Sequence, residues 1–177
     1  HLVSCLGEHQ YPLHGKPSIG LALDGLGMGE DGSLWGGEVL LFNYQGFRRV
    51  GSIESMPLLG GVKAILEPLR CLLGQLVSYQ LLDDQTRALD CFAGKPLDTL
   101  LQMWQKKLNS PLCSSAGRLF DAVAALLNLA SVNTYEAQAA MLLESAACQY
   151  IQHHGWPEEP GLMASQRDQS QENQPLN

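Results

Sequence analysis

The chain has 177 residues, of which 45% are hydrophobic, and its formal net charge is −7. This length suits one domain with a core of its own. The negative charge, with no basic cluster longer than Arg48-Arg49 or Lys106-Lys107, argues against a nucleic-acid or anionic-membrane surface. No run approaches the roughly 18 apolar residues of a membrane span.

The first ten residues are predicted to form a helix, followed by a loop over 11–17. His1, Cys5 and His9 are spaced by four and would lie on one side of this helix. They could ligate a metal, but polar residues on a helix surface are the interpretation we favour.

Three strands are predicted next, over 18–24, 34–44 and 47–54. Their short connections favour an antiparallel meander. Gly36-Gly37, inside the second strand, indicates a bulge or a close backbone approach.

The first strand delivers Asp24 into a stretch that carries Gly25, Gly27, Gly29 and Gly32. A carboxylate at the start of a glycine-rich turn is typical of phosphate or metal sites, because bare backbone N–H groups can surround an anion. The alternative is a plain hairpin turn, which glycine and aspartate also favour.

After a loop over 56–62 the apolar period becomes helical, in the four segments 64–79, 97–108, 115–129 and 135–153. Pro68 must kink the first of these helices or lie in its first turn. Ser114 or Ser115 is a natural N-cap for the third, and Thr134 for the fourth. Residues 155–177 are polar and are predicted to be a disordered tail.

The cysteines do not form a CxxC pair, which argues against a cysteine zinc site. They are Cys5, Cys71, Cys91, Cys113 and Cys148. An odd number of cysteines at scattered positions fits free thiols in a reduced, cytoplasmic protein. Because the chain begins with His1 and not Met, we expect a processed chain or a piece of a longer protein.

Three long blocks occur in a specific order: ALDGLGMGEDGSLWGGE (22–38), PLLGGVKAILEPLR (57–70), and NSPLCSSAGRLFDAVAALLNL (109–129) with YEAQAAMLLE (135–144). Together they resemble the C-terminal catalytic module of the HypF carbamoyltransferases, which mature [NiFe] hydrogenases. The resemblance covers about residues 1–150, and we assign residues 1–154 to this module.

The resemblance implies a mixed α/β fold, part of an actin-like ATPase lobe with strands followed by helices, related to enzymes that place threonylcarbamoyl on tRNA. In the full-length family protein, ATP and carbamoyl phosphate give carbamoyl-adenylate. The carbamoyl group then passes to the C-terminal cysteine of HypE and becomes the cyanide ligand of the metal centre.

The resemblance also implies site residues. His1 matches the second histidine of a metal-binding His-x-x-x-His, and Asp24 matches the metal-binding aspartate, which makes it the candidate catalytic residue. The divalent metal would be iron or zinc, acting as a Lewis acid. Gly25 and Gly27 would turn backbone amides toward the nucleotide phosphates.

Asp121 matches the position that binds the nucleoside in the relatives, and Glu136 is a further nucleotide-site candidate. For Asp121 the alternative is a solvated helix face, paired with Arg118 at i, i+3. The chain departs from the family at Val62, where aspartate is usual, at Leu69, where tryptophan is usual, and at Ala137, where glycine is usual.

Two functions stay open. The chain is part of a carbamoyltransferase that is inactive by itself, or it is an inactive remnant that binds nucleotide weakly or offers only a partner surface. A phosphate-binding module of the wider sugar-kinase and actin class fits the blocks less well. One histidine and one aspartate are too few for a tight zinc site. Apolar faces left uncovered would cause association.

Overall fold

The structure is a computed structural model that describes residues 1–156. The part of the expected tail from residue 157 lies outside the described residues. The chain divides into a first unit, residues 1–145, and a second that begins at Ala146. The elements are α1 Leu2–Glu8, β1 Ser18–Met28, β2 Leu34–Asn43, β3 Gly46–Ser52, β4 Met56–Pro57, α2 Val62–Leu66, α3 Pro68–Ser78, α4 Asp84–Arg87, the short 3-10 helix Asp90–Phe92, α5 Leu97–Gln105, β5 Leu112–Cys113, α6 Ala116–Leu126 and α7 Gln138–His154.

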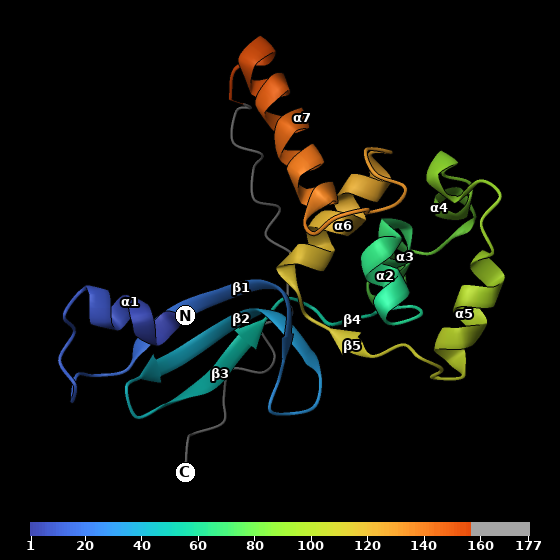
Figure 1. The fold of residues 1–177 in the computed structure, drawn as a ribbon. Coiled ribbons are helices and arrows are strands. Elements are labelled where there is room, and N and C mark those ends of the chain that lie inside the picture. The colour runs from blue at the N-terminus through green and yellow to red at the C-terminus, as the bar shows by residue number, and fades with distance from the viewer. Residues whose placement is uncertain (157–177) are drawn as a thin grey trace, which may run out of the picture. The chain divides into compact units, whose positions relative to one another are not determined.

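The sheet is built around β2 (Figure 1). β1 and β3 both pair with it antiparallel, which confirms the predicted meander. β5 joins β2 in parallel through Leu34 and Cys113, and β4 pairs antiparallel with β5. β4 and β5 were expected to be loops, since two-residue strands carry no readable period.

β1 continues past Asp24 to Met28, so the prediction of a strand that ends at residue 24 was wrong. The strand register is irregular between Leu23 and Gly27, which places Asp24 on a bulge inside β1. Gly27 pairs with Trp35, and the turn to β2 starts only at Gly29, whose N–H donates to the Ser33 carbonyl at 2.8 Å.

Gly36 and Gly37 mark a close backbone approach, one of the two predicted outcomes. A Cβ on Gly37 would lie 2.3 Å from the Ser114 carbonyl oxygen, and one on Gly36 would lie 2.6 Å from the Asp24 carbonyl oxygen. Glycine is therefore required where β2 passes both β1 and the segment that follows β5.

The helical segments lie where the period predicts them, with altered bounds: helix begins already at Val62, inside the expected loop, and α7 ends at His154. Pro68 is the first residue of α3 and separates it from α2, as expected. α5 and α6 end at Gln105 and Leu126, shortly before Lys107 and Asn128 take a left-handed backbone. α3 packs against α6. The main core around this pair includes Met56, Leu58, Leu59, Leu72, Leu73 and Ala122.

One face of β1 is covered and the other is not. On the covered face, a Cβ on Gly20 would lie 2.8 Å from Leu2 of α1. On the opposite face Ile19, Leu21 and Leu23 are 73%, 64% and 64% exposed. The alternation follows the two-residue period of a strand and leaves an apolar surface on the sheet.

In the described part of the second unit, α7 runs to His154 and Trp156 is exposed. The Tyr150 and His154 rings stack with centroids 4.5 Å apart. Among the described residues, the helices are too short or too polar to span a membrane.

Candidate functional site

A cavity of about 370 Å³ lies within the first unit. It brings Asp24 and Gly25 together with Glu136, although more than 100 residues of chain separate them. Its lining residues are Asp24, Gly25, Leu26, Ile65, Leu66, Arg118, Asn133, Thr134, Tyr135, Glu136 and Ala137. Three of the predicted site residues thus share one cavity.

The β1 bulge is joined to the start of α6. The Ser115 hydroxyl lies 2.8 Å from the Asp24 carbonyl oxygen and 2.6 Å from that of Gly25. Ser115 also accepts the Arg118 N–H at 3.2 Å, which confirms it as the N-cap of α6. Gly117 permits the contact, because a Cβ there would lie 2.8 Å from the Gly25 Cα.

Asp24 is exposed, and its Oδ1 accepts the N–H of Gly25 at 2.6 Å. The Gly25 amide is therefore occupied by the neighbouring carboxylate. Gly27 does not line the cavity; it is paired with Trp35 in the sheet. The predicted contacts of these two amides with phosphate stay predictions.

Asp121 does not line the cavity and is buried, 2% exposed. Its Oδ2 is 2.6 Å from Arg118 Nη1, so the pairing at i, i+3 exists, although inside the protein and not on a solvated face. The Asn133 side-chain N–H donates to Asp121 Oδ1 at 3.2 Å. Burial raises the pKa of Asp121, against the opposing effects of Arg118 and Asn133. Its expected contact with a nucleoside stays a prediction.

Glu136 is exposed on the cavity wall, as a nucleotide-site residue would be. The next residue, Ala137, has φ of +60°, so the position where the family resemblance leads us to expect glycine takes a left-handed backbone. α7 consequently begins at Gln138, after the predicted start at 135. Thr134 donates its N–H and hydroxyl to Gln138 Oε1 at 2.6 and 3.0 Å.

His1 lies at a different cavity, beside Leu2, Ala22 and Phe42, and not with Asp24. Among residues 1–156, no group of three or more His, Cys, Asp or Glu side chains is placed to hold a metal ion. The residues present therefore do not build the expected iron or zinc site.

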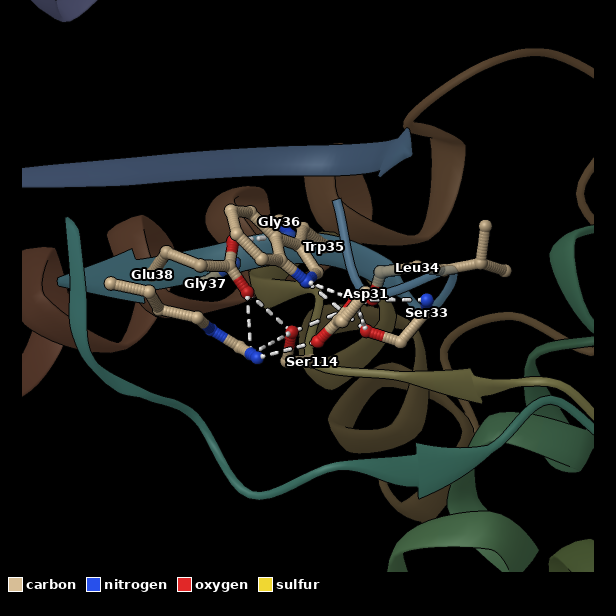
Figure 2. A network of polar contacts seen from close by, with 9 residues as sticks. Asp31, Ser33, Leu34, Trp35, Gly36, Gly37, Glu38 and Ser114 are labelled. Carbon is tan, nitrogen blue, oxygen red and sulfur yellow. Dashed lines mark hydrogen bonds and ion pairs between the residues drawn. The ribbon is translucent and has the colours of Figure 1, made fainter. Parts of the chain in front are cut away.

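Sequence reasoning missed a buried carboxylate next to this site. Glu38, 2% exposed, accepts the N–H groups of Gly36 and Gly37 at 2.6 and 2.8 Å (Figure 2). It also accepts from the Ser114 hydroxyl and from Arg49 at 3.1 Å.

Arg49 continues this network toward the β1–β2 turn. Its guanidinium lies 4.6 Å from the Trp35 ring centroid and 3.3 Å from Asp31. Glu38 directly follows the glycine pair. A charged residue beside glycines that indicate a close backbone approach is the sequence signal that could have identified it. Arg118 was considered only as the i, i+3 partner of Asp121, and it and Asn133 were missed as cavity residues.

Comparisons with known proteins agree on one family. The family model described as carbamoyltransferase, Kae1-like domain, second subdomain, matches residues 20–170. Carbamoyltransferase HypF of Rhodobacter capsulatus is 47% identical over 148 residues, covering 83% of this chain and 20% of that protein. Probable carbamoyltransferase HypF of Methanocaldococcus jannaschii is 40% identical over 151 residues, covering 83% and 19%.

Solved structures agree as well. A crystal structure of full-length HypF in the phosphate- and nucleotide-bound form superposes with a TM-score of 0.70 at 36% identity, covering 80% of this chain and 22% of that one. The likeness confirms the predicted mixed α/β, actin-like lobe. The chain spans about a fifth of the length of these relatives.

Proposed function

Since this chain belongs to the HypF carbamoyltransferase family, we propose that it acts as part of an ATP-dependent carbamoyltransferase of [NiFe]-hydrogenase maturation. Carbamoyl phosphate and ATP would give carbamoyl-adenylate, and the carbamoyl group would pass to the C-terminal cysteine thiol of HypE in the cytoplasm. The observation that carries the proposal is the cavity that joins Asp24, Gly25 and Glu136 inside the matched region.

The residues suit nucleotide binding. A cavity of about 370 Å³ is within the size range of small-molecule sites. Glu136 and Asp24 are exposed carboxylates that can accept hydrogen bonds from ribose hydroxyls. Support also comes from the solved relative, which was crystallised with phosphate and nucleotide. A metal at His1 and Asp24 would need ligands from outside the described residues, so no step is assigned to it.

A chimera tests the proposal. The matching fifth of Rhodobacter capsulatus HypF is replaced by this chain, and carbamoylation of HypE is followed by mass spectrometry with ATP and carbamoyl phosphate. We expect transfer by the chimera and its loss, by at least a hundredfold, with Asp24→Ala. The matched control is Asp84→Ala, an exposed aspartate outside the cavity, which should transfer normally.

Undiminished transfer by Asp24→Ala would remove this carboxylate from the mechanism. The alternative function is nucleotide binding without transfer. It needs only the cavity, whose exposed carboxylates suit ribose hydroxyls without any transfer step. A chimera that binds ATP in calorimetry but leaves HypE unmodified would support this alternative.

A further inference from the structure

Arg118 is a buried cation with unused hydrogen-bonding capacity. The residue is 8% exposed, and its Nε and Nη1 have no hydrogen-bond partner among the described residues. Nη1 lies 2.6 Å from Asp121 Oδ2, but the contact is an ion pair without hydrogen-bond geometry. Buried donors without an acceptor are costly, so this guanidinium favours a further acceptor where it reaches the cavity.

The guanidinium lies at the cavity wall. Arg118 lines the cavity, and a Cβ on Gly25 would be 3.6 Å from its Nη2, which places this nitrogen beside the β1 bulge. The backbone there offers less to an anion than the glycines suggest, because the Gly25 N–H already donates to Asp24. Positive charge at this wall therefore comes from the side chain.

The remaining charges restrict where an anion can bind. Arg118 is the one cationic residue among the lining residues, all of which belong to the described chain. Asp24 and Glu136 repel an anion from their own parts of the wall and suit hydroxyl groups instead. A ligand with an anionic and a hydroxyl-rich part would fit this arrangement.

Two neighbours hold Arg118 in place. Asp121 pairs with it, and Asn133 fixes Asp121 through its side-chain N–H. Asn133 is itself anchored to α2, because its side chain donates to the Ile65 carbonyl at 2.9 Å and its backbone N–H to the Leu66 carbonyl at 2.7 Å. The guanidinium is thus pre-positioned, which lowers the entropy lost on binding.

We propose that Arg118 binds an anionic phosphate group in this cavity, and that Asp121 is a positioning residue that acts through Arg118. A planar guanidinium offers several parallel N–H groups that match phosphate oxygens. The inference rests on the proposed function and adds to it the residue that supplies the charge.

Calorimetry of the 177-residue chain with two probes tests this assignment. Inorganic pyrophosphate reports on the anion site, and adenosine reports on the rest of the cavity. With Arg118→Gln we expect pyrophosphate affinity to fall at least tenfold and adenosine affinity to stay within twofold. Arg87→Gln, which removes a surface guanidinium paired with Asp98, should change neither. Circular dichroism verifies that each variant is folded.

A double-mutant cycle separates positioning from simple structural support. Asp121→Asn should weaken pyrophosphate binding in the wild-type background and have no further effect once Arg118 is Gln. An equal loss in both backgrounds would overturn the positioning role. Pyrophosphate binding that survives Arg118→Gln, or adenosine binding without any pyrophosphate binding in the wild-type chain, would overturn the anion site and leave the proposed function standing. Failure of the proposed function is scored separately, by carbamoyl transfer in the chimera.

Discussion

Ala137 holds a backbone conformation that favours glycine. Its φ of +60° lies in the left-handed region, where a Cβ adds strain of about 1 kcal/mol. We expect Ala137→Gly to raise the free energy of unfolding by about 0.5 kcal/mol, because relief of strain exceeds the added freedom of the unfolded chain. Urea denaturation measures the change.

Ala140→Gly is the control for that substitution. Ala140 lies inside α7, where glycine should lower the free energy of unfolding by about 1 kcal/mol. If both substitutions destabilise the chain by similar amounts, the strain at position 137 is not real.

Thiol reactivity reports on burial residue by residue. Burial raises the pKa of the Cys71 and Cys113 thiols, so little thiolate is present at pH 8 and reagent access is poor. Cys5 and Cys148 are exposed. We expect Ellman's reagent to modify these two rapidly in the native chain and the two buried thiols only on unfolding. Rapid native modification of Cys71 would contradict the core described above.

At the scale of elements, Glu38 connects three parts of the sheet. It belongs to β2, and it binds Arg49 of β3 and Ser114 directly after β5. Glu38→Gln should lower the free energy of unfolding by about 2 kcal/mol, because an amide nitrogen would face donors and Arg49 would lose its buried partner. Thermal and urea unfolding measure the loss.

The control for this substitution is Glu54→Gln, at an exposed carboxylate. It should change the free energy of unfolding by less than about 0.5 kcal/mol. Equal effects at both positions would mean that the Glu38 network does not stabilise the sheet.

The hydrophobic periodicity of the sequence predicted the helices and strands that are long enough to show a period. The meander of β1, β2 and β3, the break at Pro68 and the Ser115 cap all follow from local patterns. The end of the first strand was placed wrongly, because glycine and aspartate usually mark a turn. Here β1 continues through Asp24 and Gly25 to Met28 with a shift in register, and Gly117 of α6 leaves room for the Gly25 backbone.

The site could be predicted only in part, because contacts between distant segments cannot be read from local sequence patterns. Asp24 and Gly25 were marked by the strand and its glycine-rich stretch as well as by resemblance, and Glu136 by resemblance alone; the structure places them in one cavity. The Arg118–Asp121 pair follows from its i, i+3 spacing, but Asn133 joins the cavity through tertiary contacts with α2 and α6. No local spacing encodes such contacts.

At the scale of the whole molecule, the described residues leave one apolar surface of the sheet uncovered. Ile19, Leu21 and Leu23 project from β1, which pairs with a neighbour on one side only in the described sheet. Such surfaces promote association. We expect the isolated chain to self-associate at micromolar concentration in sedimentation velocity, and the double variant Ile19→Thr, Leu21→Thr to shift it toward monomer.

Val62→Thr is the matched control for the sheet surface. Val62 is 72% exposed but belongs to α2 and not to the sheet, so its replacement should leave the association unchanged. A wild-type chain that sediments as a monomer at these concentrations would show that this surface does not drive association.

The hydrogen bonds between Ser115 and the β1 bulge also determine which parts of the chain fold first. They link residues 90 and 91 positions apart, whereas the strand hairpins close over a few residues. Closing the longer loop costs about 2.5 kcal/mol more in chain entropy. The meander should therefore gain amide protection before α6 docks, and pulse-labelling hydrogen exchange would show Val39 protected ahead of Arg118. The cavity exists only after that last closure, so ligand binding during refolding should lag behind sheet formation.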